Sequence, residues 1–87
     1  MFYTYILRCS DGSFYIGHSN DPDSRERRHN EGRGGAYTLQ RRPVKLVYVE
    51  SFGTLSEAIG RERQLKRWTR KKKEALIDGD MARLKRL

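Results

Sequence analysis

Two short runs of aromatic, branched and other apolar residues, separated by one turn, constrain the fold of this chain more than any other feature. Residues 2–9 and residues 13–19 both have this character, and Ser10-Asp11-Gly12 lies between them. Runs of strand length that are joined by a glycine-containing turn predict a β-hairpin. The chain is therefore expected to begin with two antiparallel strands.

The length of the turn decides the register of the hairpin, because a shift of one residue moves every side chain to the other face. If Asp11 and Gly12 alone form the turn, Tyr5 and Tyr15 project from opposite faces. If all three form a loop with a left-handed glycine, Tyr5 faces Gly17 and the bulky apolar residues segregate, so we prefer this register. It predicts one face with Phe2, Ile6, Phe14 and Ile16 and another with Tyr5, Leu7, Tyr15 and Gly17.

A polar helix is predicted after the hairpin. Asp21 is a suitable N-cap and Gly32 a suitable stop, but no apolar residue lies between them. Whichever side of this helix meets the sheet must do so with polar groups. Arg25 and His29 are four residues apart and share a face. We expect this pair to line a site, the alternative being an ordinary solvated surface.

The rest of the chain predicts one more strand and two more helices. A capping box, Thr54 with Glu57 three residues later, opens a helix that runs to about Thr69. With the hairpin and the polar helix, these elements predict an α+β domain with a small three-stranded β-sheet flanked by helices, in the order β-β-α-β-α-α. The remaining predictions are a loop over 33–43 with one helical turn near Tyr37, a largely buried strand over 44–49, a short helix over 74–77 and a basic tail.

One carboxylate stands out on the predicted helix after the third strand. Glu62 lies in the middle of an apolar stripe that runs from Leu55 to Leu65. A carboxylate on such a face is costly unless a cation or a metal ion pairs with it. A structural salt bridge, for example to Arg25, and a metal site are both open at this point.

The charge of the chain favours a polyanion as partner. Its 87 residues make one small domain with 19 Lys and Arg against 11 Asp and Glu, a net charge of +8. Nucleic acid is the commonest polyanion, with a ribosome-associated or merely basic protein as the alternative. Neither a signal-peptide pattern nor a membrane-spanning run occurs, so a cytoplasmic protein without a membrane partner is expected. The single cysteine, Cys9, fits a small core residue.

Two tripeptides in the hairpin carry a resemblance to a known family. Tyr3-Thr4-Tyr5, followed by Tyr15-Ile16-Gly17, resembles the paired motif of the GIY-YIG nuclease superfamily, as found in its small single-domain bacterial members. The first motif has Tyr-Thr in place of Gly-Ile but keeps the final tyrosine. The similarity continues through Arg25 and His29 on the next helix to Glu62 on the helix after the third strand.

The resemblance implies a nuclease-like domain over residues 1–78, followed by a basic tail over 79–87. Members of this superfamily hydrolyse DNA phosphodiester bonds, so the implied activity is a metal-dependent DNA endonuclease in repair or processing. The alternative is a nucleic-acid-binding module of the same fold that cuts weakly or not at all.

The resemblance also implies roles for the five matching residues. Glu62 would hold one Mg²⁺ or Mn²⁺ ion, because a hard cation prefers carboxylate oxygen. Tyr5 or Tyr15 would activate the attacking water while the other orients the phosphate; since tyrosine has a pKa near ~10, a nearby cation would have to lower it. Arg25 would stabilise the developing charge, and His29 would assist proton transfer or phosphate binding. His18 has no role in this interpretation.

A set of basic, aromatic and glycine residues is expected to contact DNA. Lysine and arginine would bind phosphates, glycine would let the backbone approach, and a tyrosine would stack on a base or bond a phosphate. The predicted contact residues are Gly17, Arg33, Tyr37, Arg41, Arg42, Lys66, Arg70, Lys71 and Lys72.

Overall fold

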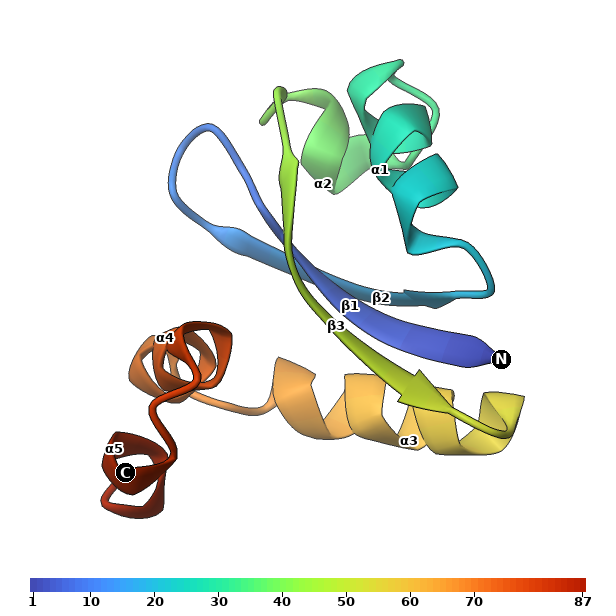
Figure 1. The fold of residues 1–87 in the computed structure, drawn as a ribbon. Coiled ribbons are helices and arrows are strands. Elements are labelled where there is room, and N and C mark those ends of the chain that lie inside the picture. Colours follow the sequence, from blue (N-terminus) through green and yellow to red (C-terminus); the bar gives the residue numbers. More distant parts are fainter.

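A three-stranded antiparallel sheet with helices on both sides forms the protein in the computed structural model, which describes residues 1–87 (Figure 1). The strand order is β2-β1-β3, so the first strand is central and the other two are edges. The predicted α+β class is confirmed; a short helix lies where one helical turn near Tyr37 was predicted, and one further short helix lies in the predicted basic tail. The strands are β1 (Phe2–Arg8), β2 (Phe14–Ser19) and β3 (Lys45–Phe52), and the helices are α1 (Pro22–Asn30), α2 (Ala36–Leu39), α3 (Leu55–Lys66), α4 (Arg70–Asp78) and α5 (Met81–Lys85).

The hairpin has the predicted register. Tyr5 pairs with Gly17 and Leu7 pairs with Tyr15, as the three-residue loop requires. Gly12 closes this loop with φ of 84°, in the left-handed region that glycine adopts without strain. The turn chemistry and the segregation of apolar side chains thus agree on one register.

Each face of the sheet carries its own apolar cluster. The prediction that the bulky apolar residues collect on one face only is therefore incomplete. The face covered by α3 and α4 buries Ile6, Ile16, Leu65 and Leu76, and the face toward α1 and α2 buries Tyr5, Leu7, Cys9 and Val44 (Figure 1).

Helix α1 is attached to the sheet by polar groups. The Glu26 carboxylate accepts a hydrogen bond from the backbone N–H of Leu46. One turn later, the Asn30 amide donates to the carbonyl of Val44 at 2.9 Å and accepts from its N–H at 2.7 Å. A helix without apolar residues can therefore be fixed to β3, because its side chains satisfy strand backbone groups that would otherwise lack partners.

The third strand differs from its prediction. It runs over Lys45–Phe52 instead of 44–49, and its residues are mostly half-buried because it lies at an edge of the sheet. Its pairing with β1 shifts register between Ile6 and Leu7, as at a β-bulge.

The C-terminal part is more helical than predicted. The side chain of Thr69 accepts a hydrogen bond from the N–H of Lys72 at 3.3 Å, so α4 begins at Arg70 and not at residue 74. The helix therefore includes the four consecutive basic residues 70–73. After Gly79 the chain forms α5, whose Leu84 packs on the cluster beneath the sheet. No helix is long and apolar enough to cross a membrane.

Candidate active site

A cavity of about 360 Å³ lies beside β2 and gathers side chains from both strands of the hairpin, from α1 and from α3. Four of the five residues predicted to be catalytic line it, although they are far apart in the sequence. These four are Tyr5, Tyr15, Arg25 and Glu62, and the other lining residues are Phe2, Gly17, His18, Ser19, Asn20 and Leu55.

Tyr5 lies at the inner wall of this cavity, and Gly17 makes room for it. A Cβ atom at position 17 would lie 2.6 Å from the Tyr5 hydroxyl oxygen, far inside van der Waals contact. Burial, followed by the nearby Tyr15, raises the pKa of Tyr5, and the opposing effect of Arg25 is smaller. Arg25 alone thus leaves Tyr5 protonated at neutral pH, and the lowering of a tyrosine pKa by a cation stays a prediction.

His29 lies behind Tyr5 and does not line the cavity. Its side chain is buried, with Nε2 3.4 Å from the Tyr5 hydroxyl and Nδ1 2.7 Å from the Thr38 hydroxyl. Burial, with smaller contributions from Arg25 and Arg28, lowers the pKa of this imidazole. His29 is therefore a neutral residue that adjoins the cavity through Tyr5 and Tyr15, which line it.

The loop before α2 is shaped around this histidine. A Cβ at Gly34 would lie 2.0 Å from Nδ1 of His29, so only glycine fits there. The Thr38 hydroxyl, the other partner of His29, also lies 3.5 Å from the Gly35 carbonyl, to which it donates. Neither Gly34 nor Thr38 was singled out in the sequence as a partner of His29, because a contact between a loop and a buried ring follows no periodic pattern.

Arg25 presents an uncommitted guanidinium to the cavity. It is half-buried on α1, yet it takes part in none of the ion pairs or side-chain hydrogen bonds of the molecule. The salt bridge to Glu62 that the sequence left open is not formed. The donors of Arg25 are thus available to an anionic ligand.

Glu62 is held instead by two other residues. Its Oε1 lies 2.5 Å from Nδ1 of His18 and its Oε2 lies 2.8 Å from Nζ of Lys66. Burial would raise the pKa of Glu62, but the hydrogen bonds and charges of Lys66 and His18 together hold it below its usual value. An ionised carboxylate, with its side chain 14% exposed, therefore faces the cavity.

His18 is the site residue that sequence reasoning missed. The spacing of Glu62 and Lys66 on one helix face is visible in the sequence, but the approach of His18 from β2 depends on how α3 packs against the sheet. A polar residue directly after Gly17, on the opposite face of the strand, was the available signal.

The donor set can hold one hard cation but makes no cage for it. No group of three or more His, Cys, Asp or Glu side chains is arranged to bind a metal ion. Mg²⁺ and its relatives need only one or two carboxylates when water and substrate oxygens fill the other positions. Glu62 is the one carboxylate of this cavity, so it fits that mode of binding.

The predicted DNA-contact residues around α2 are largely engaged within the protein. Arg33 pairs with Glu31, and Arg42 donates to the carbonyl of Leu39 at 3.0 Å. Arg41 pairs with Asp11 at 3.1 Å and lies over the ring of Tyr37, 3.9 Å from its centroid; Tyr37 itself is exposed.

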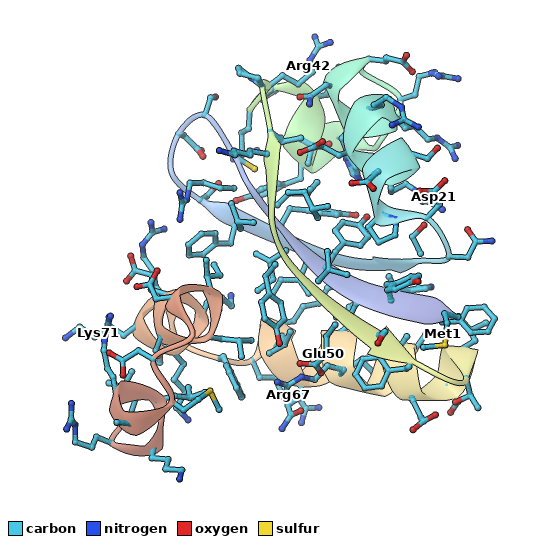
Figure 2. All side chains as sticks on the ribbon, viewed as in Figure 1. Met1, Asp21, Arg42, Glu50, Arg67 and Lys71 are labelled. Carbon is cyan, nitrogen blue, oxygen red and sulfur yellow. The ribbon has the colours of Figure 1, made fainter.

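The predicted contact residues near α4 differ in accessibility. Lys66 is bound to Glu62, and Arg70 approaches Glu74 at 3.6 Å. Lys71 points away from the body of the molecule, while Arg42 lies at the opposite end (Figure 2). The basic residues thus form separate groups and not one continuous patch.

Comparisons with known proteins agree with the resemblance in the hairpin motifs. The family model described as "GIY-YIG catalytic domain" matches residues 1–75. The chain is 50% identical over 76 residues to a UPF0213 protein of Bacillus pumilus, covering 87% of this chain and 78% of the relative. It is 51% identical over 75 residues to a UPF0213 protein of Staphylococcus aureus, covering 86% of this chain and 92% of the relative.

Two solution NMR structures are also similar to it. The UPF0213 protein of Bacillus halodurans has a TM-score of 0.59 and 41% identity, covering 92% of this chain and 86% of that one. A protein of E. faecalis has a TM-score of 0.59 and 44% identity, covering 88% of this chain and 82% of that one.

Proposed function

This chain belongs to the GIY-YIG catalytic-domain family, and from that premise we propose that it is a metal-dependent endonuclease that hydrolyses phosphodiester bonds in DNA, in repair or processing. The observation that carries the proposal is the single cavity lined by Tyr5, Tyr15, Arg25 and Glu62. Two hydroxyls, a free guanidinium and an ionised carboxylate together provide the groups that phosphodiester hydrolysis requires.

Glu62 is the proposed metal ligand. Together with water and substrate oxygens it would hold one Mg²⁺ or Mn²⁺ ion, which supplies positive charge against the departing oxygen. Lys66 and His18 keep the carboxylate ionised and oriented through their hydrogen bonds. These two residues act on Glu62 and are therefore positioning residues.

Tyr5 and His29 are proposed to move the proton of the attacking water. In the tautomer that this relay uses, Nδ1–H of His29 donates to the Thr38 hydroxyl, whose own proton can face the Gly35 carbonyl, and Nε2 is the acceptor that faces Tyr5. Tyr5 can then pass its proton to Nε2 as it accepts one from water. A neutral histidine and a protonated tyrosine are the states that this relay needs.

Arg25 and Tyr15 are proposed to bind the phosphate itself. The guanidinium of Arg25 can donate two parallel hydrogen bonds to phosphate oxygens, and these strengthen as negative charge develops. The Tyr15 ring lies 4.9 Å from the ring of His29, which fixes its position in the cavity wall. Tyr15 is therefore assigned the orienting role, and Tyr5 the activating one.

The test compares DNA cleavage by the wild-type protein and Glu62→Gln. Supercoiled, single-stranded and branched DNA would be incubated with Mg²⁺, with Mn²⁺ or with EDTA. We expect cleavage that needs the cation and falls by about 100-fold or more in Glu62→Gln. Glu74→Gln, which changes a carboxylate on α4 outside the cavity, is the control. If no DNA is cut, or if Glu62→Gln cuts as fast as wild type, the assignment is wrong.

A second candidate function is a nucleic-acid-binding module that cuts little or nothing. The observation in its favour is that both oxygens of Glu62 already have partners in His18 and Lys66. Such a module would bind DNA with an affinity that falls steeply with salt but would leave the strands intact. Binding and cleavage measured on the same substrates separate the two functions.

A further inference from the structure

A second cavity, of about 260 Å³, adjoins the first, and Tyr15 lies in the wall of both. Four apolar or aromatic side chains and two lysines line it, none of which belongs to the proposed catalytic set except Tyr15. The lining residues are Phe14, Tyr15, Ile16, Tyr37, Lys66 and Lys73.

This cavity lies at the free edge of β2. Three consecutive strand residues, Phe14 to Ile16, line it, although successive side chains point to opposite faces of a sheet. Only a cavity that straddles the edge of the strand can meet all three. Because β1 pairs with β2 on the other side, this is the unpaired edge, where no further strand covers the opening.

The aromatic part of the cavity is held in place by cations. The Tyr37 ring is 40% exposed and lies 6.2 Å from the Tyr15 ring, at an angle of 33° between the planes. Arg41, itself fixed by Asp11, lies over Tyr37, and Arg70 lies over the ring of Phe14 at 4.7 Å. Rings held this way lose little conformational freedom when a flat ligand stacks on them.

The lysines add positive charge at the same place. Lys66 links the two cavities, because it also binds Glu62 in the first. Lys73 pairs with no carboxylate, so its ammonium group is free to meet a phosphate. A flat apolar wall beside the free ammonium group of Lys73 fits one nucleotide, with the base against the rings and the phosphate at Lys73.

We propose that this second cavity binds one unpaired base adjacent to the phosphodiester that the first cavity holds, so that the substrate class is DNA with unpaired nucleotides beside the cut. The proposal rests on the proposed function for the position of that phosphodiester. A volume of about 260 Å³ lies just below the ~300–1,000 Å³ of drug-sized ligand sites and therefore suits one base. A base in a duplex is stacked on both faces and cannot enter, whereas an unpaired base enters at little cost.

The test measures stacking directly and needs no cleavage. Oligonucleotides with 2-aminopurine at one position, either unpaired in a gapped duplex or paired in a full duplex, would be titrated with protein in EDTA. We expect wild type and Tyr37→Phe to quench the unpaired probe. Tyr37→Ala should lose the quenching and bind the gapped DNA at least about fivefold more weakly, with a smaller loss on the full duplex.

Two variants control for folding and for charge. Leu39→Ala removes an exposed side chain of the same short helix outside the cavity, and we expect it to quench as wild type does. Lys73→Gln should weaken binding of the gapped DNA and reduce its salt dependence, whereas Lys85→Gln on α5 should change neither. Loss of quenching in Leu39→Ala as well as Tyr37→Ala would overturn the assignment, since helix stability and not the ring would then be responsible.

Cleavage and quenching test the two proposed activities separately. If wild type cuts DNA in a Glu62-dependent way but quenches paired and unpaired probes equally, the base site is wrong and the nuclease stands. If nothing is cut but quenching depends on Tyr37, the base site stands and the nuclease is wrong. Tighter binding of an RNA oligonucleotide of the same sequence would overturn the assignment to DNA.

Discussion

The two faces of the sheet are packed by different means. Beneath the sheet, α3 and α4 bury leucine and isoleucine side chains in the ordinary way. Above it, α1 is joined to β3 by Glu26 and Asn30, and the side chains it directs inward are Arg25 and His29. A helix can thus be fixed to a sheet through hydrogen bonds to strand backbone groups, and its inward-facing side chains can then be polar residues that line a site. The buried leucine and isoleucine side chains beneath the sheet should therefore govern stability, whereas the cavity-lining residues Arg25 of α1 and Glu62 of α3 should govern activity.

The free energy of unfolding should change most when a buried residue between the sheet and α3 is shortened. Leu65 is fully buried, so Leu65→Ala should lower the free energy of unfolding by about 2–5 kcal/mol, through lost burial and the cavity left behind. Urea denaturation followed by circular dichroism measures this. Leu55→Ala, at an exposed leucine of the same helix, should change it by less than about 0.5 kcal/mol. Equal losses in both variants would refute the placement of Leu65, and not Leu55, in the buried cluster of this face.

The polar face should show the reverse pattern at Arg25. Arg25→Ala should lower the rate of DNA cleavage by about 100- to 1,000-fold, because the guanidinium has no partner in the free protein and is proposed to bind the phosphate. Its free energy of unfolding should stay within about 0.5 kcal/mol of wild type. Arg27→Ala, on the exposed side of α1, is the control for charge. A large loss of stability in Arg25→Ala would mean that this residue supports the fold instead.

The polar attachment of α1 can be broken separately. Asn30→Ala removes both hydrogen bonds to Val44 and leaves buried backbone groups unpaired, which should cost about 1–3 kcal/mol of stability. Glu26→Gln keeps an acceptor for the Leu46 N–H and should cost less than Glu26→Ala. Chemical denaturation of the three variants checks the order. If Asn30→Ala were neutral, the attachment of α1 would have to be explained by other contacts.

The free energy of unfolding should also depend on pH through His29, and this change should be smaller than those above. Because the folded protein lowers the pKa of His29 below 6.5, the unfolded chain binds more protons between the two pKa values. The contribution of neutral His29 to the free energy of unfolding should be fully present above about pH 6.5. It should decrease as the pH falls toward the pKa of His29 in the folded protein, by at most about 1.4 kcal/mol per pH unit. His29→Gln should lack this part of the slope, and thermal melts at a series of pH values would measure it. Identical slopes would contradict a neutral buried His29.

Much of the fold could be predicted because its signals are local. The hairpin register follows from a choice between two turns that differ in how completely they segregate apolar residues. The caps at Asp21 and Thr54 accept the hydrogen bonds that their sequence positions predict. These features depend on neighbours within a few residues, which a single sequence displays.

The parts that could not be predicted depend on contacts between distant segments. Glu62 was recognisable as an anomaly on α3, but its partner His18 is fixed by the packing of α3 against β2. The hydrogen bond that the Leu46 N–H of β3 donates to Glu26 links backbone to a side chain and follows no periodicity. The raised pKa of Tyr5 reflects burial, which the identity of a residue does not reveal.

The position of β1 at the centre of the sheet has a consequence for the order in which the site forms. Tyr5 and Tyr15 lie on two strands that are joined by a tight loop, whereas Glu62 lies on α3, which follows β3, a strand that pairs with β1 across a long stretch of chain. Because local contacts cost less loop entropy than distant ones, we expect the tyrosines to meet early in folding and the carboxylate to arrive last. We therefore expect a partly folded chain to hold the two tyrosines together without the carboxylate that is proposed to bind the metal ion.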